Sequence, residues 1–133
     1  MPDDTKKPEP RMRTIFLIIL ILLLVYSPIH AADKWDKMDY SLLAASSVLK
    51  VIDWQQTRYI ANNPDRFYEQ NPILGKHPSE TEVNLYFVAS YAGQVIIAHY
   101  LPSKYRKCWL GLWIGMSGRN SIHNNSIGIK MQW

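Results

Sequence analysis

Apolar residues gather first in one unbroken run, IFLIILILLLVY, which covers residues 15–26. Lysines and arginines precede this run, and a proline and the small pair Ala31-Ala32 follow it. Basic, apolar and small residues in this order are typical of a secretory signal peptide. The run is shorter than the ~20 residues that cross a bilayer, but extension to Ala32 gives about enough length for a retained anchor. We therefore expect residues 1–13 to be a disordered basic segment and residues 14–32 to be a signal peptide or a signal anchor.

The next pattern, DYSLLAASSVLKVIDWQQTRYI, repeats at helical spacing. The positions that fall on one face are Leu42, Leu49, Asp53, Gln56 and Ile60, separated by steps of seven, four, three and four. These steps predict a helix over about 40–61 that follows Asp39 as its N-cap. Asn62, Asn63 and Pro64 should end the helix, because proline cannot continue it and asparagine accepts a left-handed exit. The predicted inner face is therefore partly polar.

A second helix is indicated by a capping box. Ser79 and Glu82 stand three positions apart, as the two members of such a box do, and they predict a helix over about 80–101. The stretch from 83 to 101 carries no formal charge. This stretch is accordingly the best candidate for a membrane span after the N-terminal run.

A third helix is expected over about 105–125, where the pattern opens apolar and then turns polar. Pro102 and the basic turn KYRK, residues 104–107, should separate it from the helix before. The last residues, 127–133, alternate between apolar and other positions, which is a weak strand signal.

These patterns predict an all-α protein, in which a signal or anchor segment precedes a small three-helix, membrane-associated bundle over residues 33–133. The N-terminal basic residues favour a cytoplasmic start, and a second helix that crosses inward would also bring KYRK to the cytoplasm. We therefore expect the bacterial inner membrane, with exported segments facing the periplasm. The net charge of +4 suits an anionic membrane surface, and the chain has no stripe of lysines and arginines that would indicate nucleic acid as a partner.

Few residues indicate covalent or metal chemistry. The single cysteine, Cys108, excludes an intramolecular disulfide and lies in an apolar run, so we expect it to be buried as a small apolar residue. The four histidines show no H-x-x-x-H spacing, and C-x-x-C is absent, so neither a metal nor a cofactor is predicted. Gly111 and Gly115 form a small-x-x-x-small face, which favours close helix packing.

The polar residues that are candidates for a site are Asp53, Gln56, Thr57, Glu69, Asn71, His99, Arg119 and His123. Asp53 and Gln56 lie on the apolar face of their helix, where an ionisable side chain is a functional hypothesis by default. The alternative is structural: Asp53 pairs with Lys50, Arg58 or Arg119, and Gln56 bonds a neighbouring helix. We favour the structural interpretation.

Two short motifs in this region resemble those of a group of small proteins. The D-x-x-x-T of DWQQT, with Asp53 and Thr57, and the E-x-N-P-x-L of EQNPIL, with Glu69 and Asn71, resemble small bacterial and phage-associated membrane or exported proteins of unknown function. The resemblance covers roughly residues 53–101. It implies a helical membrane architecture and no activity. In our interpretation of the residues themselves, these four side chains form a polar knot that fixes the loop against the bundle.

Together the patterns favour a small integral envelope membrane protein without catalytic activity, which acts by packing with the lipid bilayer, with a second copy or with another membrane protein. One alternative is a membrane-embedded hydrolase or transferase that uses Asp53, Glu69, His99 and His123. That alternative supposes that the two histidines approach each other in an antiparallel helix pair. A phage-type lysis or exclusion factor is a further alternative, which the small size and the basic charge permit.

Overall fold

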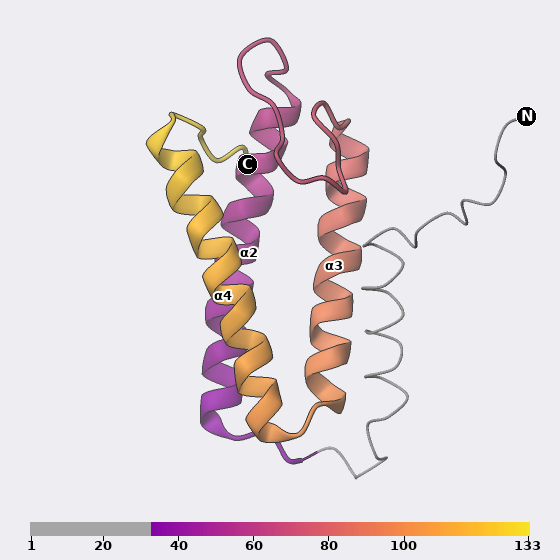
Figure 1. Cartoon of the computed structure of the whole chain (residues 1–133), viewed down its shortest axis with the longest axis vertical. Coiled ribbons are helices and arrows are strands. Elements are labelled where there is room, and N and C mark those ends of the chain that lie inside the picture. Colours follow the sequence, from indigo (N-terminus) through magenta and orange to yellow (C-terminus); the bar gives the residue numbers. More distant parts are fainter. Residues whose placement is uncertain (1–32) are drawn as a thin grey trace, which may run out of the picture. The chain divides into compact units, whose positions relative to one another are not determined.

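The computed structural model describes residues 33–133, which form an all-α bundle of three consecutive antiparallel helices (Figure 1). The helices are α2 (Lys37–Ala61), α3 (Glu80–Tyr100) and α4 (Ser103–Ser126). The predicted fold class and helix number are therefore confirmed for this part of the chain. The α2–α3 loop and the C-terminal residues lie at one end of the bundle, and the short α3–α4 connection lies at the other (Figure 1). The predicted signal or anchor, residues 14–32, and the basic segment before it lie outside the described residues.

Helix α2 begins earlier than predicted. Asp36, and not Asp39, is the N-cap, and the two form a reciprocal capping box: the Asp39 N–H donates to Asp36 Oδ1 at 2.8 Å, and the Asp36 N–H donates to Asp39 Oδ2 at 3.1 Å. Both residues carry a carboxylate, so the sequence alone does not say which is the cap. The helix ends at Ala61 as expected, but its C-cap, Asn62, keeps a right-handed backbone with φ of −88°.

The capping box of Ser79 and Glu82 is present at the start of α3, as predicted. Only Leu101 and Pro102 separate α3 from α4, so the basic residues 104–107 form the first turn of α4 and no connecting turn. The prediction that they separate the two helices is therefore wrong.

No helix within residues 33–133 is both long enough and apolar enough to cross a membrane. The expectation that residues 83–101 form a span is thus wrong. The physical reason is that this uncharged helix carries amides that bond its neighbours. Asn84 Oδ1 accepts a hydrogen bond from Trp54 Nε1 at 2.8 Å, and Gln94 Nε2 donates to Ser46 Oγ at 3.0 Å.

Buried polar side chains outnumber buried apolar side chains in the bundle. Within residues 33–133, six apolar side chains besides Pro78 are buried, against nine that are polar or charged. The buried apolar residues are Ile60, Val83, Phe87, Ala98, Leu110 and Ile129. The buried polar residues are Asp39, Ser46, Lys50, Gln56, Thr57, Gln94, Arg106, Ser117 and Ser121. Large apolar side chains meanwhile remain exposed on all three helices. Polar groups that are removed from water need hydrogen-bond partners, so the interior of this bundle depends on specific polar contacts.

The outer surface of α4 differs from prediction at two points. Cys108 is exposed, so the expectation that it is buried is wrong. A Cβ built at Gly111 or Gly115 meets no atom within 4 Å. These glycines therefore contact no other helix of the described chain, and packing through them stays a prediction about contacts with other molecules.

The C-terminal residues form no strand in the described part of the chain. Gly128, with φ of +85°, turns the chain back after α4, Ile129 is buried, and the Gln132 N–H donates to Gln55 O at 3.3 Å. The alternating pattern had suggested a strand, but no second strand is present here to complete a ladder. One apolar side chain packs instead on the end of the bundle.

Candidate functional site

A hollow of about 590 Å³ lies between α2, α4, the α2–α3 loop and the first half of α3. Side chains from all four segments line it, and many are polar or aromatic. The charged and titratable residues among them are Lys50, Asp53, Glu69, Arg119 and His123. Other lining residues include Thr57, Tyr68, Asn71, Tyr86, Phe87, Trp113 and Asn120. A second hollow, of about 510 Å³, lies on the α2–α3 loop between residues 64–68, Lys76 and His77.

Asp53 is the most perturbed acid of the hollow. Burial, and to a smaller extent the negative charge of Glu69, raise the pKa of Asp53 to about 6. A side-chain hydrogen bond from Asn120 and the positive charge of Lys50 act in the opposite direction and lower it. The balance shows that burial outweighs the polar contacts that favour the carboxylate.

Lys50 lies one turn before Asp53 on the same face of α2, and its side chain is 5% exposed. Burial lowers the pKa of Lys50 to about 8, and the charge of Asp53 only partly opposes this effect. Its ammonium nitrogen lies 3.9 Å from the ring centroid of Trp113 and 5.5 Å from that of Phe87. The aromatic rings therefore hold this cation by cation–π attraction.

The predicted polar knot of Asp53, Thr57, Glu69 and Asn71 takes a different form. All four residues line the hollow, yet no hydrogen bond joins the two loop residues to the two helix residues. Glu69 Oε1 accepts from the N–H groups of Gln70 and Asn71 at 2.9 and 2.8 Å, so the loop binds this carboxylate itself. The four side chains surround an open space and do not tie the loop directly to the helix.

Gln56 does not line the hollow and bonds α4, as the structural interpretation expected. Its Nε2 donates to the carbonyl oxygen of Ser121 at 3.3 Å, and its Oε1 accepts from Asn124 Nδ2 at 3.3 Å. Arg58, which was one expected partner of Asp53, instead forms an ion pair with Glu80. Gln56 and Arg58 therefore act in packing, one to α4 and one to α3.

The two candidate histidines lie apart. His123 lines the hollow, whereas His99 lies in the last turn of α3, at the opposite end of the bundle. The α3–α4 connection is short, so His99 lies level with the start of α4, and His123 is twenty positions further along, about 30 Å at the helical rise. The expected approach of His99 and His123 is therefore wrong, and the hydrolase or transferase hypothesis loses one of its four residues.

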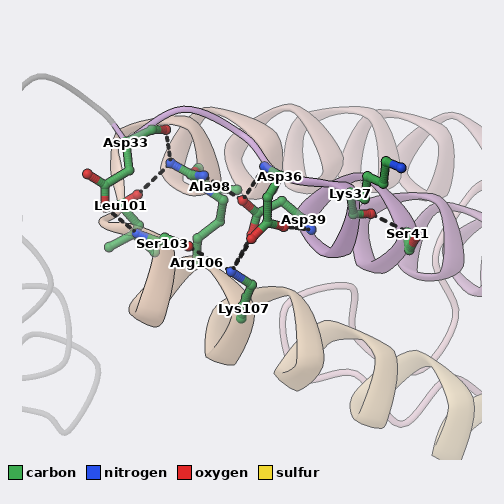
Figure 2. Close-up of polar contacts among 10 residues, drawn as sticks. All are labelled: Asp33, Asp36, Lys37, Asp39, Ser41, Ala98, Leu101, Ser103, Arg106 and Lys107. Carbon is green, nitrogen blue, oxygen red and sulfur yellow. Dashed lines mark hydrogen bonds and ion pairs between the residues drawn. The ribbon is translucent and has the colours of Figure 1, made fainter.

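A second polar cluster, which the sequence did not indicate, occupies the end of the bundle at the α3–α4 connection (Figure 2). Arg106 of α4 and Asp39 of α2 are both fully buried, and Arg106 Nη1 donates to Asp39 Oδ2 at 2.8 Å. The other guanidinium nitrogens donate to the carbonyl oxygens of Ala98, Leu101 and Asp33, at distances between 2.8 and 3.0 Å. One side chain thus joins all three helices and the segment before α2.

The rim of this cluster is more exposed. Lys107 Nζ donates to Asp36 Oδ2 at 2.7 Å and lies 3.7 Å from Asp39 Oδ1, while the Ser103 N–H donates to Asp33 Oδ2 at 2.8 Å (Figure 2). The hydrogen bond from Lys107 lowers the pKa of Asp36 and raises that of Lys107 itself. The residues of this cluster, called the Arg106 cluster below, are Asp33, Asp36, Asp39, Ser103, Arg106 and Lys107. The sequence signal was weak, because Arg106 stands in a basic run that resembles a surface segment.

Within residues 33–133 no three histidine, cysteine, aspartate or glutamate side chains converge as they would to hold a metal ion. Comparison with protein-family models, with curated proteins and with solved structures finds no match to this chain. The resemblance of the DWQQT and EQNPIL motifs to small envelope proteins therefore stays a prediction.

Proposed function

We propose that this chain is a non-catalytic component of the bacterial envelope, which attaches to the periplasmic side of the inner membrane and contacts lipid through the outer face of α3. The observation that supports the proposal is the number of large apolar side chains that residues 33–133 leave exposed, while many polar side chains are buried. Contiguous apolar surface of more than a few hundred Å² is rare on soluble monomers and marks an interaction surface.

The outer face of α3 is the most suitable part of this surface. Leu85, Val88, Ile96 and Tyr100 are 69, 56, 57 and 71% exposed. Their spacing places them on one side of the helix, over about 22 Å at the helical rise. No formal charge interrupts the stretch from residue 83 to 101. An uncharged apolar helix face of this kind fits the boundary between lipid headgroups and acyl chains, where the helix lies in the plane of the membrane.

Two sequence features favour the same location. The apolar run at residues 15–26 has the composition of an export signal or anchor, and the net charge of +4 favours an anionic leaflet. Packing with a second copy or with another membrane protein would use the same apolar surface, and the experiment below separates these cases from contact with lipid.

The test is fluorescence quenching on the full chain in vesicles. In a Cys108→Ala background, Val88→Cys places a fluorescent label on the outer face of α3, and Asp65→Cys places the same label on the exposed α2–α3 loop as a matched control. We expect a quencher attached to lipid acyl chains to quench the label at Val88 several-fold more than the label at Asp65, and iodide in the buffer to give the opposite order. Equal iodide quenching at both positions would contradict contact with lipid. Protection of the Val88 label from both quenchers would indicate a protein partner.

A further inference from the structure

The hollow at the α2–α3 loop holds charges of both signs that do not pair with each other. Asp53 and Glu69 contribute carboxylates, while Lys50 and Arg119 contribute cations. Within the described chain, none of these four takes part in an ion pair at 4.0 Å or less. Charges elsewhere in the described chain are paired, as in Arg58 with Glu80 and in the Arg106 cluster.

The geometry keeps Lys50 and Asp53 from neutralising each other. They stand three positions apart on α2, a spacing at which a lysine and an aspartate can pair. The Lys50 ammonium instead lies over the ring of Trp113 at 3.9 Å from its centroid. Within the described chain, neither charged group therefore has an ion-pair partner.

The rest of the lining suits a small polar molecule. The volume of about 590 Å³ lies within the range of roughly 300–1,000 Å³ that is typical of small-molecule sites. Asn71, Asn120 and Asn124 supply amide donors and acceptors, and Tyr68 and Tyr86 supply aromatic surface. Hydrogen-bonding groups and aromatic rings around one hollow can fix the orientation of a bound molecule.

We propose that this hollow binds a small zwitterion, a molecule with a primary ammonium group and a carboxylate or phosphate a few bonds away. The formal charges of Lys50, Asp53, Glu69 and Arg119 cancel, so a ligand that carries charges of both signs suits the lining better than a simple cation or anion. The ligand ammonium is placed between Asp53 and Glu69. Its anionic group contacts Arg119, which is exposed at the mouth, because a guanidinium binds carboxylate and phosphate in a bidentate manner.

The effect of burial on the two α2 residues supports this assignment. Burial raises the pKa of Asp53 to about 6 and lowers that of Lys50 to about 8, as expected for charged groups that lack a full partner. In the proposed pose the ligand ammonium lies beside Asp53, so it would lower the pKa of Asp53 toward its ordinary value. Binding should consequently weaken as the pH falls through about 6, where Asp53 becomes protonated. Glu69, Arg119 and His123 also face the hollow.

Two sources can supply this chemistry: a free amino acid, peptide or phosphoethanolamine, and the headgroup of a zwitterionic lipid. Binding at the hollow does not depend on the membrane contact proposed for α3. That contact uses apolar side chains on the outer face of α3, whereas the hollow uses charged and polar side chains.

The first test is calorimetric titration of the full chain in a maltoside detergent, which carries no zwitterion of its own. We expect phosphoethanolamine or glycylglycine to bind at least tenfold more tightly than ethanolamine or inorganic phosphate alone. Arg119→Gln and Asp53→Asn should each weaken binding at least tenfold.

The matched controls are Lys104→Gln and Asp65→Asn. Both residues are exposed and neither lines this hollow, so these changes should alter the affinity less than twofold. Because Arg119 is exposed, its variant tests the site even if Asp53→Asn alters folding.

Binding of the zwitterions no tighter than of ethanolamine and phosphate would overturn the proposal, and so would unchanged binding in Arg119→Gln. Neither result would alter the quenching expected at Val88, so the two proposals can fail separately. The source is identified by titrating phosphoethanolamine into the chain in nanodiscs. If phosphoethanolamine binds more weakly in phosphatidylethanolamine nanodiscs than in phosphatidylglycerol nanodiscs, a lipid headgroup competes for the site. Equal affinity in the two supports a free zwitterion.

Discussion

The two ends of the bundle differ in the contacts that their buried charged side chains make. At the α3–α4 connection, the Arg106 guanidinium donates to one carboxylate and three carbonyl oxygens, and no part of the side chain is exposed. Toward the α2–α3 loop, Lys50 and Asp53 face a hollow and meet no ion-pair partner within the described chain. The difference shows in the pKa values, since burial raises that of Asp53 and lowers that of Lys50.

The comparison shows what offsets the free-energy cost of burying a charged side chain. A buried charge is tolerated when hydrogen bonds replace the water that it loses, and the helix ends around Arg106 provide carbonyl groups that no intrahelical N–H uses. Ala98 and Leu101 belong to the last turn and C-cap of α3, where such carbonyls are available. The middle of α2 offers no free carbonyl to Lys50, so an aromatic ring takes that place. The cation at one end of the bundle is therefore held by hydrogen bonds to carbonyl groups at a helix end, and the cation at the other end by an aromatic ring.

The largest effect should follow from Arg106→Met. The change removes four hydrogen bonds and leaves Asp39 buried without its partner, which typically costs about 3–5 kcal/mol in the free energy of unfolding. Thermal and denaturant melts of the full chain in one detergent measure it.

Lys104→Met is the control for that variant, because Lys104 is exposed two positions earlier on the same helix and should change the unfolding free energy by less than about 0.5 kcal/mol. The double variant Asp39→Leu with Arg106→Met should recover part of the loss, since no charge is then stranded. A loss for Arg106→Met no greater than that for Lys104→Met would remove the distinction between the two ends.

A smaller effect of opposite sign is expected for Asp53→Asn. The pKa of Asp53 in the folded chain is about 6, above its ordinary 3.8, so the folded state binds the proton more tightly than the unfolded state. The free energy of unfolding therefore falls as the pH rises from about 4 to about 6, and the penalty is complete above that range. Asparagine carries no such penalty. The variant should be more stable than the parent chain at pH 7, by at most about 3 kcal/mol, and about equal near pH 4.

Denaturant melts of Asp53→Asn at intervals from about pH 4.5 to pH 7.5 measure this dependence, with Asp65→Asn as the matched control. A gain that is the same at every pH would show that the charge of Asp53 is not its cause. The expected combination, a gain in stability with a loss of zwitterion affinity, is typical of residues that are kept for function.

Local signals explain which parts of this fold could be predicted from the sequence. The start of α3 depends on Ser79 and Glu82, and the end of α2 depends on the segment up to Pro64. Each of these residues acts within a few positions of itself, and both predictions are confirmed. The inward position of Asp53 follows from helical period alone. The start of α2 was misplaced because Asp36 and Asp39 are chemically alike and differ only in which of them the tertiary structure uses as the cap.

Long-range contacts could not be predicted in the same way. Arg106 and Asp39 are 67 positions apart, and their ion pair depends on the order in which three helices meet. The basic run around Arg106 indicated a surface segment, since nothing local distinguishes a buried arginine from its exposed neighbours. For the same reason, the sequence suggested that His99 and His123 meet, although the short α3–α4 connection places them at opposite ends.

The smallest effect, and the one that defines the hollow most closely, is expected for Lys50→Met. The pKa of Lys50 in the folded chain is about 8, below its ordinary 10.5, so the folded state binds this proton less tightly than the unfolded state. The free energy of unfolding is therefore reduced below about pH 8 and rises as the pH increases from about 8 to about 10.5.

Methionine at position 50 has no charge to bury, but it also loses the attraction to Trp113, worth about 1–2 kcal/mol. Because this lost attraction offsets part of the burial penalty that is removed, we expect a net gain of only about 1–2 kcal/mol at pH 7. The decisive measurement is the pH dependence: the rise in stability between about pH 8 and pH 10 should be present in the parent chain and in the exposed control Lys130→Met, and absent in Lys50→Met. If Lys50→Met instead loses several kcal/mol, as Arg106→Met should, then the ammonium has a full partner in the hollow, and the two ends of the bundle bury charge in the same way.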